Sequence, residues 1–215
     1  MSMKRILAAE ALGTALLVAT VIGSGIMAQR LSSGNDAIAL LGNTAATGAV
    51  LYVLISLLGP ISGAQFNPAV TLLLGSKAPR HLIILTQIVA GVAGAALAHG
   101  MFDLHLWQQG IKVRTGAGQW LGEMVASFGL LLTIRLAIRH RPESVPALVA
   151  GWIVAGYWFT SSTSFANPAV TIARAFTESF SGIRPIDAPG FIVAQTFGGA
   201  IGYWTAGWLI KEDAS

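Results

Sequence analysis

The sequence predicts an all-α integral membrane protein with six membrane-spanning helices and two short re-entrant helices, arranged as an inverted 3+3 repeat. Three observations lead to this fold class. Hydrophobic residues make up 54% of the 215 residues, and charged residues make up only 10%, whereas soluble domains carry roughly 25% charged residues. Apolar runs long enough to cross a bilayer recur along the chain. The pentapeptide Asn-Pro-Ala-Val-Thr occurs twice, at residues 67–71 and 167–171, which indicates two related halves.

Six apolar segments are candidates for spanning helices, because a helix needs about 20 residues to cross the hydrocarbon core. They lie at about residues 6–28, 37–58, 82–101, 119–138, 146–162 and 189–210. Two further apolar stretches follow the pentapeptides. Each is only about ten residues long, which is typical of re-entrant segments.

Each pentapeptide carries a helix-start signal, because Asn caps free backbone N–H groups and Pro fits the first helical position. We therefore expect one short helix from Pro68 to about residue 77 and another from Pro168 to about residue 177. The N-terminus of each helix carries the positive end of its dipole. In a membrane protein, paired short helices whose positive ends face one point are typical of a pore.

The repeat extends beyond the pentapeptides to the order of the whole chain. Each half reads as a Glu-bearing span, a second span, an Asn-Pro helix and a Gln-bearing span; the marker residues are Glu10, Gln87, Glu123 and Gln195. Because each half has an odd number of spans, the halves (about 1–110 and 111–215) take opposite orientations within a single domain, 1–215. This symmetry places Asn67 and Asn167 at matching depth near the midplane, where each amide can offer an N–H to a passing solute.

The basic residues predict the orientation in the cell (inner) membrane. With a cytoplasmic N-terminus, the cytoplasmic basic residues are Lys4, Arg5, Lys77, Arg80, Arg135, Arg139, Arg141 and Lys211. The basic residues on the other side are Arg30, Lys112, Arg114, Arg174 and Arg184. Because basic residues favour the cytoplasmic side, this multi-pass topology has both termini in the cytoplasm.

Glu10 and Glu123 are the carboxylates deep in the predicted spans. An intramembrane carboxylate is a functional candidate. We favour a supporting role, in which each accepts hydrogen bonds from the irregular backbone that leads into a half-helix, at Pro68 or Pro168. The alternative is a proton relay, but no Lys, Arg or His occupies a comparable central depth.

Several function classes have little support in the sequence. The absence of Cys excludes thiolate metal sites and cysteine catalysis. The histidines lie near span ends or in loops without metal-ligand spacing: His81, His99, His105 and His140. The hydroxyls of residues 161–164 have no base positioned beside them. The net charge of +4 is scattered, so nucleic acid is not an expected partner. We therefore expect no enzyme, cofactor or metal site.

Small residues also recur at four-residue spacing within the spans, as Gly91 and Ala95, Gly118 and Gly122, and Gly198 and Gly202. Such spacing lets helix backbones approach closely in a membrane. We therefore expect close helix contacts at these positions.

The sequence resembles the aquaporin and glycerol-facilitator (major intrinsic protein) family of membrane channels. The resemblance rests on both Asn-Pro-Ala motifs, on Ala-Glu-Ala-Leu-Gly-Thr at 9–14, on Ser-Gly-Ala-Gln-Phe-Asn-Pro-Ala-Val-Thr at 62–71, and on the six-span order. It covers essentially the whole chain. It implies a right-handed bundle of six helices and two half-helices, assembled as a homotetramer with one pore per subunit.

The resemblance also implies a selectivity filter of four residues near the paired Asn residues. Counting from the motifs puts these at Thr47, Ala155, Ser164 and Val170, and a shift of one residue replaces Ala155 with Gly156. The family usually has Arg directly after the second Asn-Pro-Ala, where this chain has Val170. Such a filter is wider, with two hydroxyls and an apolar wall, and its exclusion of cations is weaker.

Arg174 lies one helical turn beyond Val170, on about the same face and roughly 6 Å further along. Two interpretations remain open at this point. Arg174 is a pore-mouth residue that repels cations or attracts anionic solutes, or it reaches the interface or binds loop carbonyls.

The leading functional hypothesis is passive conduction of small uncharged polar solutes: glycerol, urea and metalloid hydroxides, with some water. The Val at 170 also resembles a branch of the family associated with bacterial arsenic resistance, which implies passage of methylated arsenicals. The alternative is a coupled secondary transporter, since inverted repeats with broken helices also build transporters. A third hypothesis is a structural tetramer with little flux.

Overall fold

The computed structural model describes residues 1–211, so the last residues of the expected domain 1–215 lie outside the described part. Within it the chain forms eight α-helices: α1 (Met3–Leu31), α2 (Asp36–Ser62), α3 (Pro68–Leu74), α4 (Arg80–Met101), α5 (Ala117–His140), α6 (Val145–Phe159), α7 (Pro168–Arg174) and α8 (Ala188–Ile210). Short 3-10 turns precede α6 at Pro142–Ser144 and α8 at Pro185–Asp187. The protein is all-helical over this range.

Each of the six predicted spans corresponds to one helix. Four of these, α1, α2, α4 and α5, are long and apolar enough to cross a membrane by length and composition. Helix α8 has 23 residues. Helix α6 has only 15 residues and ends at Phe159, three residues before the predicted end at residue 162, because the chain turns at Thr160 and heads back toward α7.

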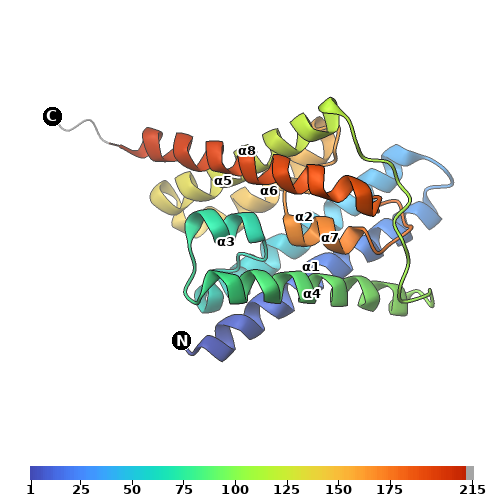
Figure 1. Ribbon diagram of the computed structural model, residues 1–215, viewed down its shortest axis with the longest axis horizontal. Helices are drawn as coiled ribbons and strands as arrows, with labels where there is room; N and C mark the ends of the chain where they lie inside the picture. The colour runs from blue at the N-terminus through green and yellow to red at the C-terminus, as the bar shows by residue number, and fades with distance from the viewer. Residues whose placement is uncertain (212–215) are drawn as a thin grey trace.

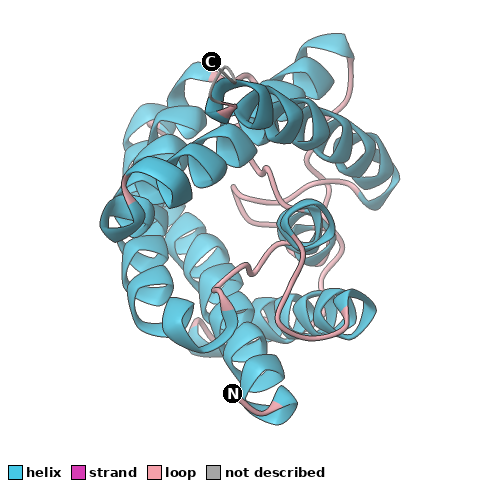
Figure 2. Ribbon diagram, turned by 90° about the vertical axis from the view of Figure 1, so that its left-hand side faces the viewer, coloured by secondary structure: helices cyan, strands magenta, loops and turns pink. Residues whose placement is uncertain are grey.

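The long helices run side by side along the long axis of the molecule (Figure 1). Helix α1 packs against α2 and α4, α5 packs in the same way against α6 and α8, and α2 contacts α6 across the two halves. Viewed from the end, loop segments lie inside the surrounding helices (Figure 2). Two of the enclosed segments lead into α3 and α7, which contact each other.

Both short helices begin at the predicted residues, but each is shorter than predicted. Helices α3 and α7 have seven residues each, ending at Leu74 and Arg174. Helix α3 stops because Gly75 adopts φ +80 and ψ 178, a non-helical backbone conformation that glycine tolerates and other residues rarely adopt. A length of seven residues is about 10 Å, a third of the hydrocarbon core.

Glycines allow the closest helix contacts, although not all at the predicted positions. A Cβ at Gly202 would clash with the backbone of Phe128, and one at Gly198 with the backbone of Met124, so α8 lies directly against α5. The corresponding contact of α4 with α1 is at Gly94, over the carbonyl of Ala15. The predicted Gly91 instead faces α7 and the side chain of Val18 at ordinary contact distances.

The predicted pair Gly118 and Gly122 does not lie against another helix backbone. The nearest atoms to a Cβ at either position belong to Ser161 and Ser162, in the turn after α6. These glycines make room for a loop that enters the bundle.

Candidate functional site

Two asparagines cap the short helices at the centre of the protein. Asn67 Oδ1 accepts a hydrogen bond from the backbone N–H of Ala69 at 3.0 Å. Asn167 Oδ1 accepts from Ala169 N at 2.9 Å and from Val170 N at 3.3 Å. Pro68 and Pro168 occupy the first helical turns, where their missing N–H groups cost nothing.

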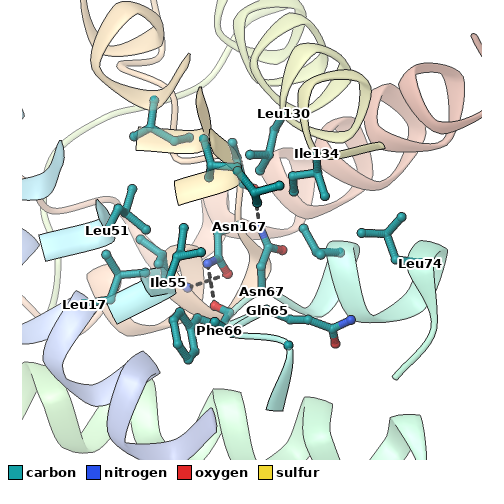
Figure 3. Close-up of a pocket in the computed structure, with 18 of the residues that line it drawn as sticks. Leu17, Leu51, Ile55, Gln65, Phe66, Asn67, Leu74, Leu130, Ile134 and Asn167 are labelled. Atoms are coloured by element: carbon teal, nitrogen blue, oxygen red, sulfur yellow. Dashed lines mark hydrogen bonds between the residues drawn. The ribbon is translucent and has the colours of Figure 1, made fainter. Parts of the chain in front are cut away.

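The same two side chains bridge the halves of the chain. Asn67 Nδ2 donates to the carbonyl of Ala166 at 2.7 Å, and Asn167 Nδ2 donates to the carbonyl of Phe66 at 2.8 Å. The N-termini of α3 and α7 are therefore held against each other, and Figure 3 shows the two amides side by side at the wall of a cavity. Each amide group has a second N–H that neither of these hydrogen bonds uses.

The chain enters each short helix through a strained backbone. Ala64 and Phe66 have φ of +48°, and Ser164 and Ala166 have φ of +47° and +48°. Residues other than glycine rarely adopt this left-handed backbone region, because it costs free energy. They keep it only where surrounding contacts hold the backbone in place. The matched positions in the two halves indicate that both segments follow the same path.

Glu10 holds the first of these segments. Its Oε1 accepts from Ser62 Oγ at 2.6 Å and from Gln65 N at 3.0 Å. Its Oε2 accepts from Phe66 N at 2.8 Å and from Gln87 Nε2 at 2.9 Å. The fully buried carboxylate thus satisfies backbone N–H groups of the irregular segment that leads into α3.

Glu123 holds the second segment with the same geometry. Its two oxygens accept from Phe165 N and Ala166 N, both at 2.9 Å. Gln195 Nε2 donates to Glu123 Oε2 at 2.5 Å and contacts Thr171 Oγ1 at 2.8 Å. These contacts fit a carboxylate that stabilises the irregular backbone before α7.

A cavity of about 390 Å³ runs along the two asparagines. Its lining includes α6 residues from Val145 to Tyr157, which corresponds to about 18 Å along the helix axis. Aliphatic side chains from α1, α2, α3 and α5 form most of the wall (Figure 3): Leu17, Leu51, Ile55, Leu74, Leu130 and Ile134. Polar groups are therefore few and localised.

Three of the four expected filter residues, Thr47, Ser164 and Val170, line this cavity. Ala155 does not, because it is exposed on the outer face of α6. The cavity therefore gives no support to Ala155 as a filter residue. The cavity face of α6 is formed by Ile153 and Tyr157, one helical turn apart.

The alternative at this position, Gly156, is buried beside Ser164 rather than in the cavity lining. A Cβ on Gly156 would lie 2.6 Å from Ser164 Oγ, so the glycine makes room for that serine. Counting from the motifs misses the helical phase of α6, because the turn at residues 160–167 separates the two elements.

Tyr157 brings a hydroxyl into the cavity that the sequence analysis missed. Its hydroxyl lies 3.4 Å from Thr47 Oγ1, which also donates to the carbonyl of Asn43 at 2.8 Å. Ser164 Oγ lines the same region and has no hydrogen-bond partner among the described residues. The only sequence signal for Tyr157 was its place on a helical face with Val149 and Ile153.

Arg174 is buried, with 1% of its surface exposed, and it also lines the cavity. Its Nε donates to the carbonyl of Ser181, and its guanidinium carbon lies 3.3 Å from the ring centroid of Phe165. Its Nη1 has no partner within residues 1–211. Arg174 therefore binds a loop carbonyl and faces the cavity at once.

Arg114, another residue that sequence reasoning missed, fixes the loop over the same region. Its Nε donates to the carbonyl of Gly182 at 2.8 Å, and its Nη1 donates to the carbonyl of Ser162 at 3.1 Å. Its guanidinium carbon lies 4.9 Å from the ring centroid of Phe165. Burial lowers the pKa of Arg114 to about 10, and the charge of Glu123 opposes this shift. The group therefore stays protonated at neutral pH.

An ion pair on the loop before α8 anchors Arg114. Asp187 Oδ2 accepts from Arg114 N at 2.9 Å and pairs with Arg184 Nε at 2.9 Å. The hydrogen bond from Arg184 holds the pKa of the Asp187 carboxyl below its usual value. A lone Arg in a predicted loop gave no sequence signal for this network.

The other candidate groups do not form a reactive site. His99 is buried, and its ring nitrogens contact Leu106 O at 2.9 Å and Thr177 Oγ1 at 3.0 Å. Across residues 1–211, no three His, Cys, Asp or Glu side chains gather where they could hold a metal ion.

Comparison with known proteins agrees with this geometry. Residues 1–161 match the family described as major intrinsic protein. The chain is 54% identical to aquaglyceroporin AqpS of Rhizobium meliloti, over 94% of this chain and 89% of that protein. It is 30% identical to aquaporin AqpM of Methanothermobacter thermautotrophicus, over 95% of this chain and 96% of that protein. The chain therefore belongs to the major intrinsic protein family, the aquaporin and glycerol-facilitator family that its motifs resemble.

Proposed function

We propose that this protein is a passive channel for small uncharged polar solutes, with glycerol, urea and metalloid hydroxides as its solutes and some water flux. One observation carries the proposal. The cavity has an apolar wall along its length, and the two central asparagine amides each have an N–H to spare where α3 and α7 meet. A solute with several hydroxyl or carbonyl oxygens can exchange water contacts for these donors as it passes.

The same centre disfavours ions. The N-termini of α3 and α7 face each other through the two Asn bridges, so two positive dipole ends lie at one place. A cation or a hopping proton meets unfavourable potential there, and a neutral solute does not. Glu10 and Glu123 do not offset this effect by lining the path, because both are fully buried behind the cavity wall.

The solute class rests on the relatives and on the filter. The 54% identical relative is named as an aquaglyceroporin, so glycerol conduction is the first activity to test here. Val170 in place of the family's Arg, with Thr47 and Ser164, gives a filter of hydroxyls beside an apolar wall. We extend the proposed range of solutes to methylated arsenicals on the basis of the family resemblance at Val170.

The membrane arrangement belongs to the same proposal. Six helices (α1, α2, α4, α5, α6 and α8) span the bilayer, α3 and α7 are re-entrant, and the two halves form an inverted repeat. The pairing of α1 with α4 and of α5 with α8 supports the repeat. The family resemblance supports a homotetramer, and the distribution of basic residues supports both termini in the cytoplasm of the cell (inner) membrane.

A coupled secondary transporter is the weaker alternative. It requires an ion site or alternating access, and no observation within residues 1–211 favours either. The oxygens of Glu10 and Glu123 are taken by hydrogen bonds from their own supporting segments.

Flux into proteoliposomes tests the proposal directly. Stopped-flow light scattering should record glycerol and urea permeabilities well above those of empty liposomes, linear in solute concentration and independent of a proton gradient. Asn67→Leu removes the spare N–H of one half together with the cap of α3 and the bridge to Ala166, so it should lower glycerol flux, with thermal unfolding in detergent as the check on its fold. Permeability confined to water would refute the solute class, and saturable, proton-driven accumulation would support the transporter instead.

A further inference from the structure

We propose that Arg174 and Ser164 form a solute-binding and cation-excluding site at the α7 end of the cavity. This pair, named here the Arg174 site, takes an oxygen atom of a neutral hydroxylated solute. It replaces the donor that the family usually carries at position 170, using an arginine from one turn further along the helix. The inference rests on the proposed channel function and identifies the residue that sets its selectivity.

Helix geometry explains how Arg174 reaches this place. Residues 170 and 174 lie on one face of α7, a turn apart. Helical side chains point back toward the N-terminus, so a long side chain at 174 covers the surface near 170. The guanidinium accordingly lies over the ring of Phe165, a residue on the segment before α7, at 3.3 Å from the centroid.

Buried polar atoms that lack a hydrogen-bond partner identify the site. Several buried polar side-chain atoms have no partner in the described part of the chain, and the members of this group that line the cavity are Arg174 Nη1 and Ser164 Oγ. A buried donor without a partner is costly, because it has given up its contacts with water. Inside a cavity, a passing solute can supply the missing partner.

The positive charge of Arg174 also acts on the cavity that this residue lines. Its Nε donates to the neutral carbonyl of Ser181, its guanidinium lies over the face of Phe165, and the Tyr157 side chain also hydrogen-bonds to it. Glu123 is the carboxylate that interacts with its charge, and it lies outside the cavity lining. Arg114 approaches the same ring at 4.9 Å and adds a second cation nearby. A cation entering this end of the cavity therefore meets a guanidinium with no carboxylate beside it in the cavity lining, while a neutral oxygen meets a donor.

Arg174→Met tests the site in proteoliposomes, because it keeps much of the side-chain length but removes the charge and the donors. Potassium flux should rise at least about tenfold over the wild type, with glycerol flux reduced relative to water flux. Arg174→Lys keeps the charge, so it should still exclude potassium while losing the second donor for glycerol. Arg30→Gln is the matched charge control, since Arg30 is an exposed arginine outside the cavity lining; it should match the wild type.

Two more variants guard against a folding artefact, since Arg174 also holds the loop at Ser181. Adding Val170→Arg to Arg174→Met returns a guanidinium to the same face and should restore potassium exclusion. Ser164→Ala, which leaves the arginine intact, should lower the glycerol-to-water flux ratio about threefold.

The outcomes separate the two proposals. The Arg174 site alone would be overturned by one combination of results. In that case the wild type conducts glycerol, and Arg174→Met and Ser164→Ala both show unchanged potassium and glycerol fluxes. Absence of glycerol and urea flux in the wild type would refute the channel function, and the site with it.

Discussion

At the scale of single residues, the two buried carboxylates act only as acceptors. Glu10 accepts from four groups and Glu123 from three, and most of these donors are backbone N–H groups of the segments before α3 and α7. An ionised carboxylate suits such a set, because it offers acceptor positions and no donor. These contacts fit structural support better than a proton relay, which needs a proton-accepting neighbour along the path.

We predict that Glu10→Gln and Glu123→Gln each destabilise the protein by about 1–3 kcal/mol, because an amide N–H would face backbone donors. Glu10→Gln should be the more damaging, since it disturbs the additional bond from Ser62. Glu143→Gln, at an exposed position in the turn before α6, is the control and should stay within about 0.5 kcal/mol. Unfolding of purified protein in detergent, followed by tryptophan fluorescence, measures the differences. Equal stability of all three variants would contradict the supporting role.

Local motifs made some site residues predictable and left others out of reach. Asn67 and Asn167 carry their own signal, because capping and the following Pro act within three residues. Tyr157 and Ala155 differ only in the helical phase of α6, and packing against α2 and α5 sets that phase. Arg114 acts through loop carbonyls far away in the sequence, which no local pattern encodes.

At the scale of elements, the two halves use equivalent glycines to bring helices together. Gly94 of α4 lies seven residues after Gln87 and meets the backbone of α1, and Gly202 of α8 lies seven residues after Gln195 and meets the backbone of α5. Glu10 lies on α1 and Glu123 lies on α5, the two helices that these glycines contact. Close approach thus positions each Gln to reach both its Glu and the Thr of the short helix, Thr71 or Thr171.

We predict that Gly94→Ala and Gly202→Ala each destabilise the protein by about 1–3 kcal/mol, because a methyl group would overlap the opposing backbone. Gly151→Ala in α6 is the matched control. A Cβ there meets nothing within 4 Å, so the change should be neutral or stabilise by up to about 1 kcal/mol through helix propensity. Thermal unfolding in detergent gives the comparison. A Gly202→Ala variant as stable as Gly151→Ala would show that α5 and α8 do not need this contact.

The presence of each helix was easier to predict than the residue at which it ends. Apolar length marked all six long helices, because only a helix satisfies its backbone across a membrane. The short helices were predicted about three residues too long, because the predicted ends near residues 77 and 177 included connecting residues after the helices end at Leu74 and Arg174. Helix ends depend on backbone conformation at one residue, and apolar patterning does not record it.

At the scale of the whole molecule, the proposed functional centre lies where the two halves meet. Neither half alone completes it, because Asn67 bonds to the second half and Asn167 bonds to the first. The doubled pentapeptide predicted this meeting point. The difference between the halves beyond it, with Arg174 from α7 and Lys77 from the connection after α3 both in the cavity lining, could be seen only in the folded structure.

The proposed opposite orientation of the halves predicts a definite labelling pattern in whole cells. The chain contains no Cys, so each introduced Cys is a single reporter. Ser33→Cys and His105→Cys lie in the exposed α1–α2 and α4–α5 connections and should react with a membrane-impermeant maleimide in intact cells. Ser2→Cys and Glu143→Cys should react only after permeabilisation, because the basic clusters around them favour the cytoplasm. Labelling of Ser2→Cys and Glu143→Cys in intact cells, with Ser33→Cys protected, would reverse the orientation. Labelling of Ser33→Cys and Glu143→Cys together from outside would contradict the inverted repeat itself, since an odd number of crossings separates these two loops.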